Sequence, residues 1–388
     1  MKKLLEGSQA VAEAVRLCRP QVVAAYPITP QTHIIERLAQ HVADGELEAE
    51  FINAESEFGA ASLVLGAVVG GARAFTATAS QGLLLMTEVL FNIAGMRLPV
   101  VMVCANRALG APINIFSDHQ DSMALRDAGW IQLYVESNQE AADSVIQAYR
   151  IAEACELPVM ICIDGFFLTH TFEPVELPVQ TAVDDYLPAF HFERTLDPGQ
   201  PMTLGGGSEP DNYQEFRMAQ HDAMENAAAV IEAFDASFGE QFGRTYDGLV
   251  QVYRLKGAQT VLLGLGSLMG AVRDVVDKLR DQGQAVGALR LRCFRPFPAQ
   301  VLVQHLGTAQ RVIVLEKAFS AGAGGIVAAE LRAALQRASM TTVVESVIGG
   351  LGGRDLTPEV IEAVFHGAQL DDNDASCRFV PDEYNPVE

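Results

Sequence analysis

Between about residues 20 and 165, short apolar segments alternate with longer segments of helical periodicity. Several of the short segments are continuously apolar, which is typical of parallel strands covered by helices on both faces. The pattern therefore predicts an α/β fold, in which ligands collect at the carboxyl ends of the strands. The expected strands are QVVAAYP, AEFINA, ARAFTATA, RLPVVMVCAN, WIQLYVE and LPVMICIDG.

The alternation stops after this first unit and resumes farther along the chain. Residues 166–210 are rich in Pro, Gly and polar residues, which predicts a long, mostly irregular connection over the surface. A helix is expected from about Tyr213 to Phe238, before a second α/β unit. We therefore expect two domains, residues 1–240 with the irregular connection and residues 246–388.

The composition argues against several classes of function. The formal net charge is −22, so the surface repels phosphate backbones and we expect no nucleic-acid binding. No apolar run approaches the ~20 residues of a membrane span, and the N-terminus lacks the apolar stretch of a signal peptide. We expect a cytoplasmic protein without membrane contact. The 6 cysteines are scattered and form no C-x-x-C pair, so no metal site is expected.

The segment YPITP, residues 26–30, follows the first expected strand. Each proline fixes its own φ and disfavours helical backbone at the residue before it. Thr29 is therefore held on a stiff loop just before a helix. Alternatively, Thr29 and Pro30 only begin that helix as capping residues.

Two carboxylates, Glu55 and Glu57, stand at the start of the small-residue segment NAESEFGAASLVLGAVVGG. We expect Glu55 to be solvated, and Glu57, beside Phe58, to be largely desolvated. A desolvated carboxylate can exchange a proton with a ring nitrogen. The alternative is that Glu57 only pairs with the positive end of its helix. Position alone does not separate these two interpretations.

Polar residues also follow the next two expected strands. TATASQG precedes an apolar helix. Either the N-terminus of that helix binds an anion near Ser80, or Ser80 is an ordinary N-cap residue. Asn106 and Arg107 follow VVMVC, and the planar guanidinium of Arg107 suits a carboxylate. The loop from residue 106 to residue 130 is long for this position, and loops of that length are usually functional.

The SDHQD segment of this loop resembles a cluster of metal ligands. It offers Asp118, His119 and Asp121 within four positions. With no Cys or second His nearby, hydrogen bonding within the loop is the preferred interpretation.

Taken together, these loops resemble the α chain of the 2-oxoacid:ferredoxin oxidoreductases, above all pyruvate:ferredoxin oxidoreductase. EFRMAQHDAMENA and GGLGGRDLTP extend the similarity to nearly the whole chain. The resemblance implies a thiamine diphosphate pyrimidine-binding domain followed by a domain similar to the transketolase C-terminal domain. The matching elements, in the family's order, are AYPITP, ESEFGAA, TATASQGLLLM, ANRALGAPINIFSDHQDSM and GWIQLYVESNQEA.

The resemblance also implies roles for individual residues. Glu57 matches the glutamate that bonds to N1′ of the thiamine aminopyrimidine and so promotes removal of the C2 proton. Arg107 matches the arginine that holds the substrate carboxylate, and Thr29 matches a threonine that reaches the substrate. For the remaining candidates the implied role is proximity to the pocket: Pro27, Ile28, Ser80 and Gln81 on the cofactor side, Asn114 on the substrate side, and Asn106 with no side assigned.

The resemblance implies that this chain is half of an active site. It has no GDG…N motif and no series of cysteines, so a β subunit is expected to hold the diphosphate and Mg²⁺. Further γ and δ subunits, separate or fused, are expected to supply the functions related to coenzyme A, the co-substrate, and the iron–sulfur clusters. Ferredoxin is the expected electron carrier. Because ferredoxins are typically acidic, as this chain is, electrons should leave from a partner subunit.

Three points stay open at this level. The small-residue loop RALGAPINIF and the single threonine before Pro30 favour pyruvate, but a branched-chain 2-oxoacid is an alternative because one methylene changes selectivity little. A non-catalytic scaffold or nucleotide-binding subunit is an alternative of another class. The glycine-rich segment AFSAGAGGI is either a phosphate cradle or a turn that lets a helix pack closely.

Overall fold

The computed structural model describes residues 2–367 and 377–380. Its first unit contains a seven-stranded sheet of order β12-β6-β7-β5-β4-β2-β3, and the six strands of this unit itself run parallel, as the sequence predicted. The strand order reverses direction between β2 and β4, so polar loops meet at the carboxyl edge there. The six strands are β2 (Val22–Ala25), β3 (Glu50–Asn53), β4 (Ala74–Thr78), β5 (Val101–Asn106), β6 (Ile131–Tyr134) and β7 (Val159–Asp164).

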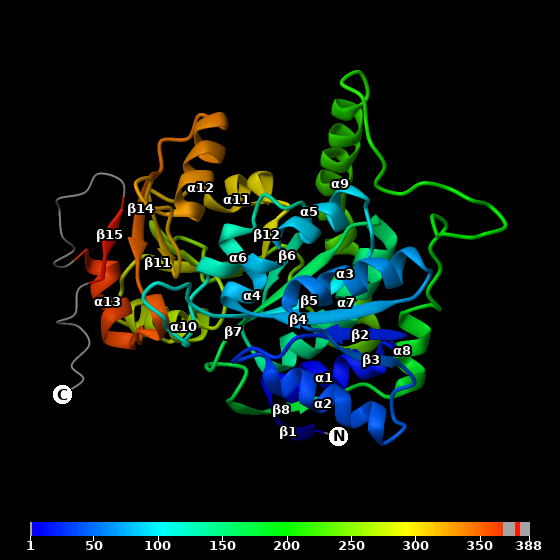
Figure 1. The fold of residues 1–388 in the computed structure, drawn as a ribbon. Coiled ribbons are helices and arrows are strands. Elements are labelled where there is room, and N and C mark those ends of the chain that lie inside the picture. The colour runs from blue at the N-terminus through cyan, green and yellow to red at the C-terminus, as the bar shows by residue number, and fades with distance from the viewer. Residues whose placement is uncertain (1, 368–376, 381–388) are drawn as a thin grey trace.

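Two groups of helices pack around this sheet (Figure 1). In one group α1 contacts both α2 and α7, and in the other α3, α4 and α5 contact one another. The helices present small and branched apolar residues to strands that are buried along their whole length. They are α1 (Gly7–Leu17), α2 (Thr32–Ala43), α3 (Glu57–Val69), α4 (Ser80–Leu85), α5 (Thr87–Gly95), α6 (Gln120–Ala124) and α7 (Asn138–Cys155).

The second unit contains a six-stranded sheet of order β15-β14-β13-β10-β11-β9, in which only β9 is antiparallel to its neighbour. Its strands are β9 (Val250–Tyr253), β10 (Thr260–Gly264), β11 (Val286–Leu291), β13 (Arg311–Glu316), β14 (Val343–Ile348) and β15 (Arg378–Phe379). Its helices are α10 (Leu268–Asp281), α11 (Ala299–Leu306), α12 (Ile326–Arg337), α13 (Pro358–His366) and the short 3₁₀ turn η1 (Leu351–Gly353).

The two units are joined by more than the chain between them. β12 (Cys293–Arg295) belongs to the second unit in sequence but pairs antiparallel with β6 at the edge of the first sheet. One apolar core cluster contains residues from strands of both sheets, among them Leu291 of β11 and Phe294 of β12. The second unit thus contributes one strand to the edge of the first sheet, and the division into residues 1–240 and 246–388 stays a prediction.

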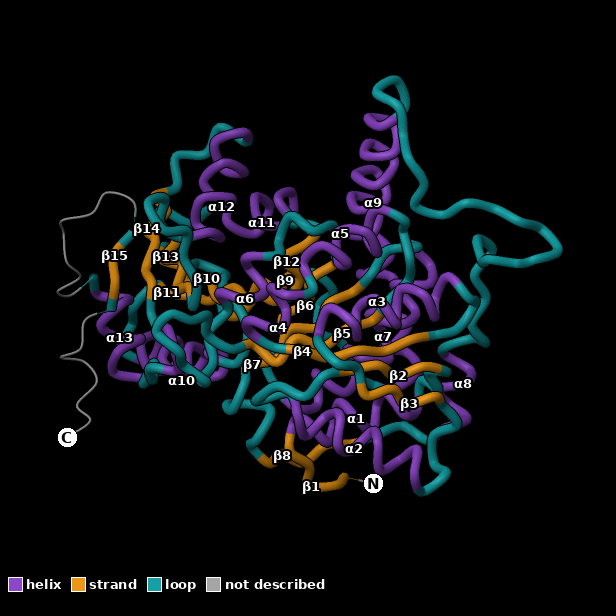
Figure 2. Tube along the Cα trace, in the orientation of Figure 1, coloured by secondary structure: helices purple, strands orange, loops and turns teal. Residues whose placement is uncertain are grey.

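The connection after β7 is more ordered than the sequence predicted. It contains β8 (Phe172–Glu176), which pairs antiparallel with β1 (Lys2–Glu6), and a short helix, α8 (Gln180–Tyr186). Beyond α8 the chain forms an arm without helix or regular strand that extends away from the body (Figure 2). The predicted long helix is α9 (Tyr213–Phe242), which continues past Phe238 to Gly243, where a φ of 72° suits glycine. None of the described helices is long and apolar enough to cross a membrane.

Candidate active site

Glu57 lies in the first turn of α3, directly beyond β3. As expected, Glu57 is buried, with 8% of its surface exposed, and Glu55 is exposed. The capping role is already filled, because the Ser56 hydroxyl accepts a hydrogen bond from the Gly59 N–H at 3.1 Å. The Glu55 carboxylate also lies against this turn, since a Cβ atom on Gly59 would meet it. The start of α3 therefore does not need Glu57.

The Glu57 carboxylate has no hydrogen-bond or ion-pair partner among residues 2–367 and 377–380. The side chain is largely buried, while its oxygens are not among the fully buried polar atoms and so remain accessible. A largely desolvated carboxylate without a protein partner is costly, so such groups are usually paired or used. The Thr78 hydroxyl, at the end of β4, is also buried and unpartnered. Two polar groups without partners at the carboxyl edge of one sheet indicate a site that receives hydrogen bonds from a ligand.

Gly82 of α4 lies between these two groups. A Cβ atom on Gly82 would be 2.6 Å from Glu57 Oε1 and 2.7 Å from Thr78 Oγ1. Only glycine lets the helix approach the carboxylate this closely.

The Gly82→Ala variant should therefore displace the Glu57 carboxylate. We expect turnover of the assembled enzyme to fall on the order of 10–100-fold, because catalytic groups tolerate little misplacement. Gly66→Ala is the matched control, since Gly66 lies in the same helix as Glu57 and a Cβ there meets nothing within 4 Å. The control should keep full activity and gain up to ~1 kcal/mol in the free energy of unfolding. Equal activity in both variants would contradict the close contact.

Asp121 ties together the loops after β4 and β5. This fully buried side chain accepts hydrogen bonds from the backbone N–H of Ser80 at 2.9 Å and of Arg107 at 3.0 Å. It also accepts a bond from the Asn106 amide at 2.8 Å, so Asn106 faces the interior. Its partners are protein groups, as the preferred interpretation of the SDHQD segment expected. Likewise, Asp118 accepts bonds from the backbone N–H groups of residues 120 and 352.

Ser80 does not cap α4, so that alternative is wrong. The N-cap is Ala79, and Ser80 has a φ of 50°. The Ser80 hydroxyl donates to the carbonyl of Ala108 at 2.6 Å and lies beside Oε1 of Gln81. Ser80 thus fixes the position of the neighbouring loop, while Gln81 is exposed and its amide lies close to Gly110.

Arg107, Thr29 and Asn114 lie together. Arg107 Nη1 donates to the Thr29 carbonyl at 3.0 Å, and Nε donates to the Asn114 carbonyl at 3.2 Å. The guanidinium is half-buried, and its remaining N–H groups meet no partner in the described part of the chain. This leaves donors of the fork for an external carboxylate.

The YPITP loop is not a helix cap. Thr29 is exposed, and α2 has Gln31 as its N-cap residue, so the capping alternative for Thr29 is wrong. Pro27 is exposed and Ile28 is half-buried against the core. The buried Gln31 side chain holds the loop by donating to the Ala77 carbonyl at 2.6 Å.

The sequence analysis missed Asp164, the last residue of β7. It is buried and accepts hydrogen bonds from Ser117 and from both the N–H and hydroxyl of Ser267, with Lys317 Nζ at 2.8 Å. His119 Nε2 lies 2.9 Å from the same carboxylate. Burial alone would raise the pKa of Asp164, but the charge of Lys317 and the contact with His119 hold it well below its usual range. The available signal was a carboxylate at the end of a buried strand.

The glycine-rich turn AFSAGAGGI is not a phosphate cradle. Glu316 fills the N-terminus of α12, accepting hydrogen bonds from the N–H of Val327 at 2.7 Å and of Ala328 at 3.1 Å. Burial raises the pKa of Glu316 to about 7, and these backbone bonds oppose the rise. Gly325 allows the close packing, because a Cβ there would collide with Glu316.

The described residues contain no group of three or more His, Cys, Asp or Glu side chains that could hold a metal ion. Five cysteines of the described residues are buried free thiols: Cys18, Cys104, Cys155, Cys162 and Cys293.

In fold, the chain is similar to a solved 2-oxoglutarate:ferredoxin oxidoreductase from Magnetococcus marinus, with a TM-score of 0.71 over 93% of this chain at 20% identity. That protein was solved with 2-oxoglutarate, coenzyme A and succinyl-CoA bound, and this chain spans 64% of its length. The architecture is thus that of the 2-oxoacid:ferredoxin oxidoreductases.

Two family profiles match the sequence. The profile described as "Pyruvate flavodoxin/ferredoxin oxidoreductase, thiamine diP-bdg" matches residues 13–236, and "Pyruvate:ferredoxin oxidoreductase core domain II" matches residues 258–361. The chain belongs to the pyruvate flavodoxin/ferredoxin oxidoreductase family. The predicted fold class and family resemblance are therefore confirmed.

Several relatives resemble the chain over nearly its whole length. The pyruvate synthase subunit PorA of Methanosarcina barkeri is 48% identical, covering 93% of this chain and 91% of the relative. The same subunit of Methanothermobacter thermautotrophicus is 49% identical, covering 93% and 94%. The ketoisovalerate oxidoreductase subunit VorA of Pyrococcus horikoshii is 43% identical, covering 94% and 93%.

Proposed function

We propose that this chain is the α subunit of a multi-subunit, thiamine diphosphate-dependent pyruvate:ferredoxin oxidoreductase. Such an enzyme interconverts pyruvate and coenzyme A with acetyl-CoA and CO₂, passing electrons to ferredoxin. The observation that most supports this proposal is the largely buried Glu57 side chain at the carboxyl edge of the first sheet, whose carboxylate has no partner among the described residues. A non-catalytic scaffold would have no use for that group.

The residues around Glu57 fit an aminopyrimidine ring. Glu57 offers an acceptor for a proton on a ring nitrogen, Thr78 offers a hydroxyl without a partner, and Gly82 leaves room beside both. When bound, thiamine diphosphate supplies the carbon nucleophile that attacks the 2-oxo group of the substrate. We propose that Glu57 holds and moves the proton at the ring nitrogen.

We propose that Arg107 binds the substrate carboxylate through the N–H groups that it does not use within the chain. Thr29, whose carbonyl orients the guanidinium, would lie beside the substrate. Pro27 and Ile28 would border the cofactor, as would Ser80 and Gln81. Asn114 would act mainly through Arg107, because its own amide is engaged with Gly352 and Phe116.

Exposed apolar side chains in the loops and helices that follow four strands of the first sheet support a partner subunit on this edge. Large exposed apolar side chains gathered at one edge often mark an interface. We propose that a β subunit covers it and holds the diphosphate and Mg²⁺. Coenzyme A-related functions and iron–sulfur clusters would belong to γ and δ, or fused, subunits in the cytoplasm, with ferredoxin as carrier. The exposed residues follow β2, β3, β4 and β5: Tyr26, Phe58, Leu84, Leu85, Ile113, Ile115 and Phe116.

A branched-chain 2-oxoacid is the second candidate substrate, because the ketoisovalerate relative matches 94% of the chain. Pyruvate remains the first, since the pyruvate synthase relatives are more similar in sequence. The predicted preference rests on the small residues of the loop that follows Arg107.

The test is purification of the native complex through this chain, followed by an assay of 2-oxoacid- and coenzyme A-dependent reduction of a viologen dye. We expect activity with pyruvate, together with thiamine diphosphate, and iron on other subunits. Activity only with a branched-chain acid would move the assignment to the second candidate. A chain isolated without partners, cofactor or activity would contradict the proposed function.

A further inference from the structure

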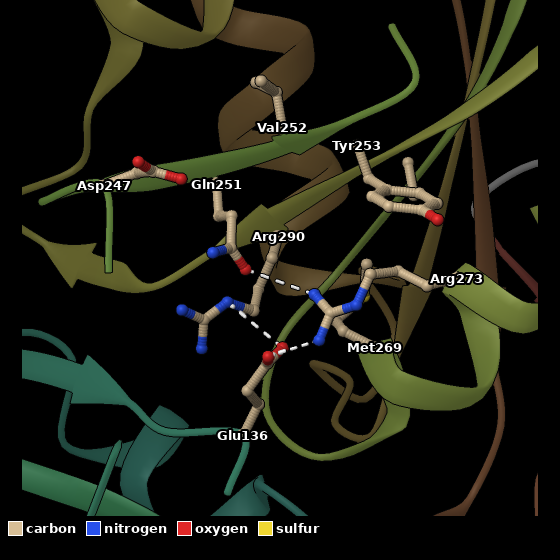
Figure 3. A pocket seen from close by; sticks show the side chains of 9 residues that line it. Glu136, Asp247, Gln251, Val252, Tyr253, Met269, Arg273 and Arg290 are labelled. Atoms are coloured by element: carbon tan, nitrogen blue, oxygen red, sulfur yellow. Dashed lines mark hydrogen bonds and ion pairs between the residues drawn. The ribbon is translucent and has the colours of Figure 1, made fainter. Parts of the chain in front are cut away.

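The second unit is fixed to the first by charged groups at their seam. Figure 3 shows Glu136, which follows β6 of the first sheet, between Arg273 of α10 and Arg290 of β11. Arg290 Nε lies 3.4 Å from Glu136, and Arg273 also donates to Gln251 at 3.2 Å. These residues line a cavity of about 220 Å³, but its arginines are already paired with carboxylates. The cavity is therefore part of the seam.

The second unit also contacts residues 107–118, which we call the Arg107 loop. The turn η1 receives that loop: the amide of Asn114 donates to the Gly352 carbonyl at 3.0 Å, and the Gly352 N–H donates to Asp118 at 3.1 Å. One residue of the second unit thus holds the loop at two points, four residues apart. The His119 N–H also donates to the Lys317 carbonyl at 2.8 Å.

This contact reaches Arg107 through one residue. The backbone carbonyl of Asn114 accepts from Arg107 Nε at 3.2 Å, while the side chain of Asn114 is held by Gly352. A shift of the turn therefore moves the carbonyl that orients the guanidinium. Gly352 and Arg107 are thus linked by two hydrogen bonds, one to the side-chain amide of Asn114 and one to its backbone carbonyl.

We propose that Gly352 and its turn in the second unit position Arg107, and thereby set the affinity for the carboxylate of the substrate. The part of this inference that concerns substrate rests on the proposed function. Gly352 is a positioning residue, since it acts on the substrate only through Asn114 and Arg107.

The geometry requires glycine at this position. Gly352 has a φ of 60°, and a Cβ there would lie 2.5 Å from Asn114 Nδ2. The next residue, Gly353, has a φ of 83°, and a Cβ there would overlap Phe116. A Cβ at Gly352 would displace the Asn114 amide from its hydrogen bond, and a Cβ at Gly353 would collide with Phe116, so either would loosen the hold of the turn on the Arg107 loop.

The test compares Gly352→Ala with Gly283→Ala in the assembled enzyme. Gly283 lies in the same unit with a φ of 84°, and a Cβ there meets nothing within 4 Å, so it reproduces the backbone cost without the collision. For Gly352→Ala we expect the KM for pyruvate to rise about ten-fold, with kcat changed less than about two-fold. The inhibition constant of the inert analogue oxamate should rise in parallel. The control should change neither value.

Hydrogen exchange of the backbone amides of residues 107–118, measured by mass spectrometry, gives a readout independent of turnover. Exchange there should be faster in Gly352→Ala and unchanged in the control. Unchanged exchange, or faster exchange with an unchanged KM, would overturn the inference. A wild-type complex without pyruvate turnover would contradict the proposed function, and exchange would still decide whether the turn positions the loop.

A second variant covers the case in which Gly352→Ala does not assemble. Asp118→Asn is similar in size but can place an N–H donor against the Gly352 N–H, which weakens the contact from the side of the loop. The same rise in KM and faster exchange are expected. A fall in kcat with no change in KM would indicate a general structural role and overturn the inference.

Discussion

Replacing Glu57 by Gln is expected to lower pyruvate-dependent turnover by about 10²–10⁴-fold, the usual contribution of a positioned proton-transfer group. The amide has nearly the same size as the carboxylate, but it cannot hold a proton for a ring nitrogen in the same way. Two measurements on the assembled enzyme check this: viologen-dye reduction, and the rate of C2 proton exchange of the bound thiamine diphosphate. Both should fall together.

The same variant should keep its stability. Glu57 has no partner in the described part of the chain, and α3 is capped by Ser56, so no folding interaction is lost. If the carboxylate only served the helix dipole, Glu57→Gln would instead lose about 0.3–1 kcal/mol and keep its activity. Glu55→Gln is the matched control, because Glu55 is an exposed carboxylate two residues earlier. Equal activity in both variants would end the assignment of Glu57.

Much of the fold was predictable because it follows from local sequence patterns. The central strands β4, β5 and β7 of the first sheet are buried along their length, and apolar runs separated by helical segments report that burial directly. The irregular connection was predicted less well. β8 is paired with β1, which is distant in sequence, and neither segment has a pattern of its own that demands a strand. β12 is similar, since it pairs across the seam with β6.

The candidate site was likewise predicted only in part. The loops with Thr29, Glu57 and Arg107 were found because they follow apolar strands, where ligands collect in such sheets. The contacts that fix those loops were not found: hydrogen bonding was expected for the SDHQD segment, but its partners were not. Asp121 and Gln31 bind backbone atoms that no sequence pattern specifies, and Gly352 lies in the other unit.

Replacing Lys317 by Met is expected to lower the free energy of unfolding by about 3–5 kcal/mol, the usual effect of removing one member of a buried ion pair. Lys317 is 5% exposed and Asp164 is 1% exposed, so the carboxylate would remain buried without its cation. Denaturant unfolding of the full chain at pH 7 measures the loss. Lys278→Met is the control, because its pair with Glu362 is equally short but exposed, and we expect no measurable loss there.

The dependence on pH and a double variant identify the cause of that loss. The folded-state pKa of Asp164 lies below its unfolded value of about 3.9, so its contribution is present above that pH and disappears as the pH falls through the folded pKa. Without Lys317 the remaining burial favours the protonated acid, so the deficit of Lys317→Met should shrink as the pH is lowered from 7 toward about 4. Adding Asp164→Asn to Lys317→Met removes the stranded charge and should recover part of the stability. A deficit that is independent of pH and unchanged in the double variant would show that Lys317 contributes packing rather than charge.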